Sequence, residues 1–190
     1  SDLAKSPMII SGHGVMISSA EKELLALAEK ADIPVACTLL GLSTIPSDHR
    51  LYKGMVGMHG NIGPNINTNK ADVLIAVGMR FDDRVTGDTS KYAPQAKVVH
   101  IDIDPSEINK NIKVTASVVG DAKAVLSRLL PHITEASHKE WLMTFERPEA
   151  GEYEKVIKIE PEPAEGMMNM GEVAMKVSEA SYHNAILVTD

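Results

Sequence analysis

Short runs of consecutive apolar residues, separated by segments with helical periodicity, are the feature that most limits how this chain can fold. Four runs cover residues 8–11, 35–40, 73–77 and 98–103, and a shorter fifth run ends at residue 119. A strand that is buried on both faces is apolar throughout, whereas a strand with one solvent-exposed face has alternating apolar and polar residues. The pattern therefore predicts an α/β fold with a doubly wound, mainly parallel sheet that helices cover on both sides.

Helix signals fill the gaps between these runs. Ser19 is a suitable N-cap, and Glu21 and Glu23 then stand in the first turn of a helix predicted to reach about residue 31. Asp121 is the predicted N-cap of a second helix, which reaches about residue 130. A further helical stretch is expected around residues 138–145, where it would pack on the end of the domain.

Composition changes near residue 148 and divides the chain into three parts. Residues 1–147 are predicted to form one α/β domain. Residues 148–168 are predicted to be a linker, because they hold three prolines and many charges and show almost no periodicity. Residues 169–190 are predicted to begin another domain, with a helix at 171–180 and a strand at 185–189. Since domain termini usually lie on exposed segments and not on buried strands, we expect a piece of a longer protein.

Charge and composition exclude several classes of function. The formal net charge of −7 is spread over mixed acidic and basic residues, and only 4% of residues are aromatic. Neither nucleic acid nor an anionic membrane surface is an expected partner of such a chain. Cys37 is the single cysteine, which excludes an internal disulfide and a zinc cluster. No apolar run approaches the roughly 20 residues of a membrane span, and we expect a cytoplasmic protein.

In an open parallel sheet, ligands bind beyond the carboxyl ends of the strands. Gly12 and Gly14 follow the first predicted strand, where glycines allow close approach to a phosphate and a following helix offers free N–H groups. The dinucleotide-binding fingerprint has a third glycine where this chain has Ile17, so a plain turn is an equal alternative. Thr38 follows the second predicted strand, and its hydroxyl could contact a ligand or cap a turn.

The stretch KGMVGMHGNIG has a glycine at every third position, from residue 54 to residue 63. This spacing destabilises a helix and leaves a sheet little to pack, so we expect a loop. Such a loop can lie against a flat ligand with Met58 and His59 projecting toward it, and methionine makes favourable contacts with rings. A surface loop without a ligand is the alternative interpretation.

Charged residues gather just beyond the third predicted strand. Arg80, Asp82, Asp83 and Arg84 follow residues 73–77 closely. A guanidinium at a strand end can bind phosphate through paired donors, and the carboxylates can orient it or accept from ribose hydroxyls. The alternative is an Arg–Asp network that holds the loop and binds no ligand.

Acidic residues end the last two predicted strands. Asp102 and Asp104 are placed where doubly wound folds often bind ribose hydroxyls, Glu107 opens the next turn, and Asp121 repeats the arrangement. Together with the glycines and arginines, they indicate a site for an elongated dinucleotide at one edge of the sheet. The sequence contains no recognisable nucleophile with a neighbouring base, no metal-binding spacing and no phosphate-loop lysine.

Three motifs carry a resemblance to a known family. GMVGMHG, ADVLIAVGMRFDDRVTGD and HIDIDPSEINKN closely resemble the central domain of acetolactate synthase (acetohydroxyacid synthase) catalytic large subunits, which are thiamine-diphosphate enzymes. The resemblance implies a Rossmann-like central domain of the FAD-binding type over residues 1–147. It also implies that residues 169–190 begin the C-terminal diphosphate-binding domain, since ILVTD is similar to the first strand of that domain.

The resemblance implies an activity for the full-length enzyme. Such an enzyme condenses two pyruvates, or pyruvate and 2-oxobutyrate, with loss of CO2 at the start of branched-chain amino-acid biosynthesis. Thiamine diphosphate and Mg2+ are expected outside this chain, between the outer domains of a homodimer or tetramer that can carry a regulatory small subunit. FAD is expected in this domain, without a redox role.

The resemblance assigns no catalytic residue and no metal ligand to this chain, and it assigns a path for FAD along the strand ends. The residues along this path are Gly12, Gly14, Thr38, Leu39, Met58, His59, Gly60, Gly78, Arg80, Asp82, Arg84, Val85, Asp102, Ile103, Glu107, Asp121 and Ala122.

The chain departs from the family at His13, where a third consecutive glycine is usual. The activating glutamate, the magnesium motif and one FAD-binding arginine are expected in other parts of the enzyme, so this chain is expected to be inactive alone. Two other readings stay open. One is a scaffold domain of a related thiamine-diphosphate enzyme, whose cleft is empty or holds another nucleotide. The other is a free-standing NAD-dependent oxidoreductase.

Overall fold

The computed structural model describes residues 4–157, 166–182 and 184–186. The chain divides into two compact units, residues 1–152 and residues 153–190. The first unit contains a parallel sheet with its helices, and the second contains the helix α7 (Met170–Ala180).

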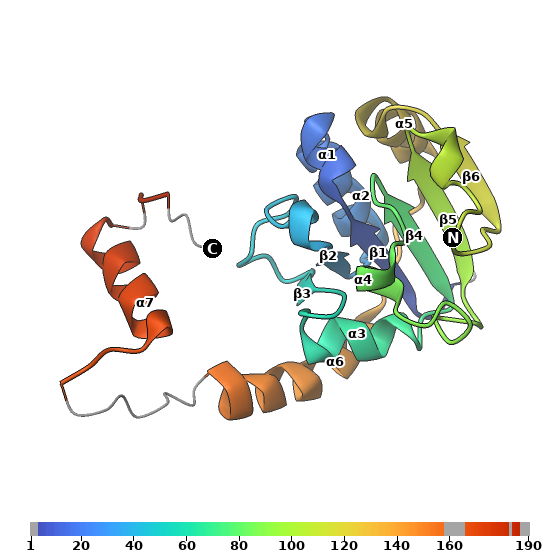
Figure 1. The fold of residues 1–190 in the computed structure, drawn as a ribbon. Coiled ribbons are helices and arrows are strands. Elements are labelled where there is room, and N and C mark those ends of the chain that lie inside the picture. Colours follow the sequence, from blue (N-terminus) through green and yellow to red (C-terminus); the bar gives the residue numbers. More distant parts are fainter. Residues whose placement is uncertain (1–3, 158–165, 183, 187–190) are drawn as a thin grey trace. The chain divides into compact units, whose positions relative to one another are not determined.

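Six strands form one sheet in the first unit, in the order β3-β2-β1-β4-β5-β6 (Figure 1). Each neighbouring pair is parallel, and this order is the one typical of dinucleotide-binding doubly wound folds. The predicted Rossmann-like α/β fold is therefore confirmed. The strands are β1 (Pro7–Ser11), β2 (Val35–Cys37), β3 (Tyr52–Met55), β4 (Val73–Val77), β5 (Lys97–Asp102) and β6 (Ala116–Val119).

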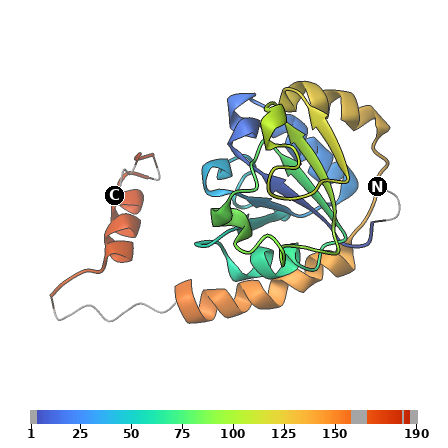
Figure 2. The same cartoon turned by 45° about the vertical axis from the view of Figure 1, so that its right-hand side comes forward.

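Helices cover both faces of this sheet, as its apolar strands require. Helices α1, α2 and α5 pack on one face, whereas α3 and α6 run side by side on the other (Figures 1 and 2). Short 3-10 turns occupy residues 39–41, 105–107 and 130–132. The α-helices of the first unit are α1 (His13–Ile17), α2 (Glu21–Ala31), α3 (Ile62–Thr68), α4 (Asp83–Thr86), α5 (Ala122–Leu129) and α6 (Lys139–Glu152).

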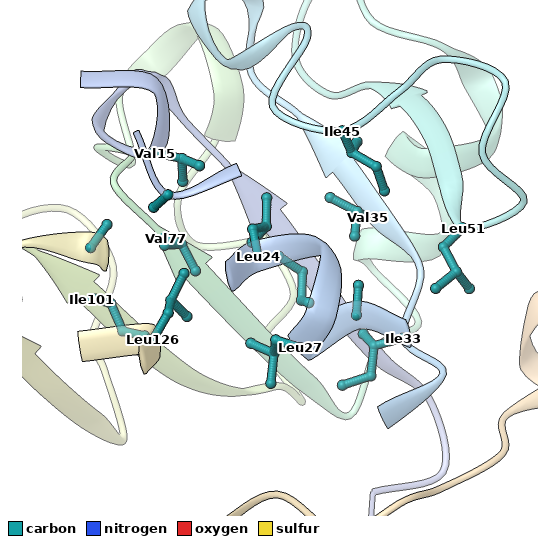
Figure 3. Packing of buried hydrophobic residues seen from close by; sticks show 14 of the residues in the cluster. Val15, Leu24, Leu27, Ile33, Val35, Ile45, Leu51, Val77, Ile101 and Leu126 are labelled. Atoms are coloured by element: carbon teal, nitrogen blue, oxygen red, sulfur yellow. The ribbon is translucent and has the colours of Figure 1, made fainter. Parts of the chain in front are cut away.

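The first core lies between the sheet and helices α1, α2 and α5 (Figure 3). Leu24 and Leu27 of α2 stand at helical spacing and are almost completely buried, as is Leu126 of α5. This packing holds the helices whose N-termini face the carboxyl edge of the sheet. The strand residues of this core are Ile9, Val35, Cys37, Val77 and Ile101.

The second core lies on the opposite face of the sheet. Successive side chains of a strand point to opposite faces, so Met8 and Ile10 of β1 enter this core while Ile9 enters the other. Trp141 and Phe145 of α6 join it, with their rings edge to face at 5.3 Å. The Trp141 Nε1–H also donates to the Pro7 carbonyl at 2.7 Å, which ties α6 to the start of β1.

Three local predictions differ from the structure. Helix α2 begins at Glu21 with Ala20 as its N-cap, because Ser19 has a left-handed φ of 52° and ends the preceding turn instead. The stretch expected as a loop contains strand β3, which pairs with β2, and its residues from Ile62 onward form α3. Helix α6 continues through Pro148 to Glu152, so the first residues of the predicted linker are helical.

In the second unit, a π-helical turn covers residues 153–157 and α7 has a capping box. The side chain of Asn169 accepts from the Glu172 N–H, and the Glu172 side chain accepts from the Asn169 N–H. The helix predicted at residues 171–180 is thus confirmed. The strand predicted at residues 185–189 lies mostly outside the described residues. None of the helices in the described part of the chain has both the length and the apolar character needed to cross a membrane.

Asp32, at the C-terminal end of α2, gives the first unit a pH-dependent stability. Burial disfavours its charged form, but the His138 backbone N–H at 2.8 Å and the Arg50 guanidinium at 2.7 Å outweigh burial and lower its pKa. A carboxyl with a lowered folded-state pKa stabilises the fold above its unfolded pKa of roughly 3.9 and loses this effect as the pH falls through the folded pKa.

We therefore expect Asp32→Asn to lower the free energy of unfolding by about 1–2 kcal/mol at pH 7 and by much less below about pH 3. Asparagine tolerates the left-handed backbone of this position, where φ is 51°. Urea unfolding at both pH values measures the difference, with the exposed Asp48→Asn as control. An equal loss at both pH values would contradict the electrostatic explanation.

Candidate functional site

A pocket of about 670 Å3 lies at the carboxyl edge of the sheet. The chain winds from β1 toward β3 in one direction and from β4 toward β6 in the other. Ligands of open α/β sheets bind in the crevice that this reversal creates. The lining residues are His13, Gly14, Ile17, Ser18, Thr38, Leu39, Leu40, Gly78, Met79, Arg80, Asp82, Arg84, Val85, Ile101, Asp102, Ile103, Asp104, Glu107, Gly120, Asp121 and Ala122.

The loops after β1 and β4 touch backbone to backbone at the centre of this edge. A Cβ atom on Gly12 would stand 2.3 Å from the Gly78 oxygen, and one on Gly14 would stand 2.7 Å from the Gly78 Cα. The N–H groups of Gly12 and Gly14 donate to Val77 and Gly78 at 2.9 Å. The contact between the two loops thus requires these glycines whether or not a phosphate binds, and their own N–H groups already have carbonyl acceptors.

Arg80 and Arg84 bring positive charge to the middle of the pocket. Arg80 is exposed, and its Nε–H donates to Asp82 at 3.1 Å. Asp82 also caps α4 by accepting from the Val85 N–H. One carboxylate thus orients the guanidinium and holds the helix that carries Arg84, while the remaining guanidinium donors of Arg80 can face an anion.

Carboxylates line the end of the pocket next to β5 and β6. Asp102 accepts from the Asp104 N–H, and Asp104 accepts from the Ser106 N–H, both at 2.9 Å. The Ser106 side chain and backbone N–H lower the pKa of Asp104, so it is charged at neutral pH. Asp121 caps α5 through the Ala124 N–H. These bonds orient each carboxylate and leave its other oxygen as an acceptor, which suits ribose hydroxyls.

Apolar side chains form the rim of the pocket. Leu39 and Leu40 are each 67% exposed, and Ile17 and Ile103 are 74% and 70% exposed. Exposed aliphatic residues around a cleft are typical of a surface that a ligand or another domain covers. His13, the departure from the family pattern, reaches across to the Leu40 carbonyl, with Nδ1 3.0 Å from its oxygen. Its ring therefore ties α1 to the 3-10 turn of residues 39–41.

Among the predicted site residues, Gly12, Met58, His59 and Gly60 do not line the pocket, and the others do. Met58 is nevertheless next to it, because its N–H donates to the Arg84 carbonyl and its sulfur lies 3.9 Å from Arg84 Nη1. His59 is exposed.

Several lining residues were missing from the predicted set. They are His13, Ile17, Ser18, Leu40, Met79, Ile101 and Gly120. Asp104, which the sequence had indicated as a candidate for ribose hydroxyls but which was left out of the FAD path, also lines the pocket. Ile17 and Ser18 belong to α1 and its C-cap, a short helix that no sequence signal indicated. Most of the other missing residues are direct neighbours of predicted ones in the sequence. They could have been found only by knowing how far each loop extends along the pocket. No group of three or more His, Cys, Asp and Glu side chains within the described residues could hold a metal ion.

Strand order and the crevice at the reversal define a Rossmann-like α/β domain with a candidate ligand site at the carboxyl edge of its sheet. Comparison with known families gives a narrower assignment. Residues 2–129 match the family described as thiamine pyrophosphate enzyme, central domain. The chain belongs to this family.

Several curated relatives are named as large subunits of acetolactate synthase. The chain is 54% identical over 127 residues to a probable acetolactate synthase large subunit of Methanocaldococcus jannaschii, covering 67% of this chain and 22% of the relative. It is 50% identical over 137 residues to the acetolactate synthase large subunit of Corynebacterium glutamicum, covering 72% of this chain and 22% of the relative. It is 42% identical over 134 residues to the acetolactate synthase isozyme 3 large subunit of Escherichia coli, covering 70% of this chain and 23% of the relative. The matched region is thus less than a quarter of each of these relatives.

Proposed function

We propose that this chain is the central, FAD-binding domain of an acetolactate synthase large subunit. The observation that carries this proposal is the pocket at the strand-order reversal, whose lining extends from Thr38 after β2 to Asp121 after β6, with arginines after β4 and oriented carboxylates after β5 and β6. The named relatives support the choice of enzyme.

The residues of the pocket fit a flavin dinucleotide. Arg80 and Arg84 would hold the diphosphate, and Asp102 and Asp121 would accept from the hydroxyls of the adenosine ribose. The exposed Leu39 and Leu40 would cover apolar ring surface. The volume of about 670 Å3 lies within the usual range of small-molecule and cofactor sites, roughly 300–1,000 Å3.

For the full-length protein we propose the condensation of two pyruvates, or of pyruvate and 2-oxobutyrate, with loss of CO2 in branched-chain amino-acid biosynthesis. Thiamine diphosphate supplies the carbon nucleophile of such a condensation when bound. We assign the ligands of thiamine diphosphate and of Mg2+ to other parts of the enzyme. A cytoplasmic homodimer or tetramer, with or without a regulatory small subunit, belongs to the same proposal.

An FAD titration of this chain, followed by flavin fluorescence, tests the cofactor assignment. We expect saturable binding, and Arg80→Ala should weaken it about tenfold or more, because a charge-assisted hydrogen bond to phosphate is lost. Arg147→Ala is the matched control, since Arg147 is an exposed arginine on α6 outside the pocket. Equal weakening in both variants would contradict a specific role of Arg80.

Two other functions remain as alternatives. A scaffold domain with an empty cleft would bind no FAD even within the full-length protein, which would then be colourless when purified. If the isolated chain does not bind FAD, the same titration on the full-length protein decides between the two. An NAD-dependent oxidoreductase would transfer hydride in an assay with nicotinamide cofactors, and we expect no such activity.

A further inference from the structure

His100 is a completely buried histidine directly behind the pocket, and it begins the HIDIDPSEINKN motif, but neither the family resemblance nor the proposed function assigns it a role. It lies on β5 opposite Ala76 of β4, two residues before the pocket-lining Asp102. Its Nε2 stands 2.8 Å from the carbonyl oxygen of Met79. A carbonyl can only accept, so Nε2 carries the proton and the ring donates to the loop that follows β4.

The neighbours of Arg80 along the chain are held in place on both sides. Met79 is 4% exposed and Phe81 is 3% exposed, whereas the Arg80 side chain between them is 68% exposed. The Met79 carbonyl accepts from His100, and the Phe81 carbonyl accepts from the Asn111 side-chain amide at 2.7 Å. Two side chains, from β5 and from the segment after it, thus fix the peptide group directly before Arg80 and the one that follows Phe81.

The His100 ring also packs edge to face against Phe81, with ring centroids 5.2 Å apart. His100 Nε2 lies 3.7 Å from the Asp102 Oδ2, which is too long for a hydrogen bond. His100 therefore contacts the residues on both sides of Arg80 in the chain and lies near the first carboxylate of the acidic end.

We propose that His100, assisted by Asn111, is a positioning residue that sets where the Arg80 guanidinium stands for an anionic ligand. The inference rests on the proposed function for its ligand, a dinucleotide diphosphate. A side chain that binds an anion with paired donors must be held within a fraction of an ångström, and the hydrogen bonds behind it supply that restraint. The competing interpretation is a histidine that only fills the core.

FAD titration of the chain with His100→Met and His100→Gln separates these interpretations. Methionine fills similar volume without a donor, whereas the glutamine amide can replace Nε2–H. We expect His100→Met to weaken FAD binding about tenfold, the effect of one hydrogen bond, and His100→Gln to restore most of the affinity. Val98→Ala is the control, because Val98 is buried on the same strand and the same face but does not line the pocket. It should lower the melting temperature and leave the FAD affinity unchanged.

A double-mutant cycle with Arg80→Ala gives the decisive readout. If His100 acts through Arg80, adding His100→Met to Arg80→Ala should weaken binding by less than twofold more. If His100→Met weakens FAD binding by the same factor in the Arg80→Ala background as in the unaltered chain, the two residues act independently and the proposal is overturned. An FAD affinity that follows the melting temperature across His100→Met, His100→Gln and Val98→Ala would also overturn it.

A ligand-free measurement keeps this inference separate from the proposed function. Long-range 1H–15N spectra of the histidine rings should show His100 protonated at Nε2, with that proton slow to exchange. Backbone amides of residues 80–82 should exchange faster in His100→Met than in Val98→Ala. If FAD fails to bind to the unaltered chain and to the full-length protein, the proposed function is wrong while these signals still decide the role of His100. An Nδ1-protonated ring, or equal exchange in both variants, would overturn it.

Discussion

Replacing Gly78 by alanine should lower the free energy of unfolding of the first unit by about 2–4 kcal/mol. Gly78 has a φ of +57°, and a Cβ atom there would stand 2.7 Å from the Gly14 Cα and 2.8 Å from the Val15 nitrogen. These are backbone atoms and cannot rotate away, so the loops after β1 and β4 would have to separate. The pocket is built across this contact, and FAD binding should be lost together with stability.

Gly87→Ala is a closely matched control for this change. Gly87 has the same φ of +57°, but a Cβ atom there would meet nothing within 4 Å. Because its ψ of −123° lies outside the left-handed helical region, its expected loss is the backbone cost alone, about 1–3 kcal/mol, without the steric clash of Gly78. Urea unfolding followed by the fluorescence of Trp141, the single tryptophan, reports on the first unit. Equal losses in the two variants would show that the close contact contributes nothing.

Phe145→Ala should lower the free energy of unfolding by about 3–5 kcal/mol, the usual range for a fully buried phenylalanine. Phe145 is 0% exposed and packs its ring against Trp141, and Lys53 Nζ lies 5.7 Å from the ring centroid. Helix α6 lies beyond residue 129, where the family match ends. A large loss would therefore show that the folded unit extends past the matched region.

Met143→Ala is the control for Phe145→Ala, because Met143 stands on the same helix and is 61% exposed. It should change the free energy of unfolding by less than about 0.5 kcal/mol. Urea unfolding followed by circular dichroism measures both variants without depending on the tryptophan next to Phe145. A small loss in Phe145→Ala would mean that α6 adds little to the first unit.

Local signals in the sequence were sufficient for most of the fold. The apolar runs identified the strands β1, β2, β4 and β5, because a strand covered on both faces has no polar side to conceal its pattern. Asp121 identified the start of α5, because a cap works through its own backbone neighbours. Strand β3 was missed, because its four residues include a lysine and a glycine and form no apolar run. It forms by pairing with β2.

The candidate site was predictable where it consists of strand ends. A parallel sheet brings all carboxyl ends to one edge, so Arg80, Asp102 and Asp121 could be placed together from their order in the chain. The sequence indicated Gly12 and Gly14 because glycines let a phosphate approach the backbone, whereas the structure shows that they are needed for contact with another loop. Gly12 and Gly14 face the backbone of Gly78, and such a contact between distant segments leaves no local trace in the sequence.

The sequence by itself determined the class of fold, the edge of the sheet that bears the site, and most of the charges there. These follow from periodicity and chain order, which are local properties. Only the tertiary structure decided what holds those charges in place, such as the donation of His100 to the Met79 carbonyl and of Asn111 to that of Phe81. Residues 100 and 79 are far apart along the chain, and their contact depends on packing that acts only once the strands have paired.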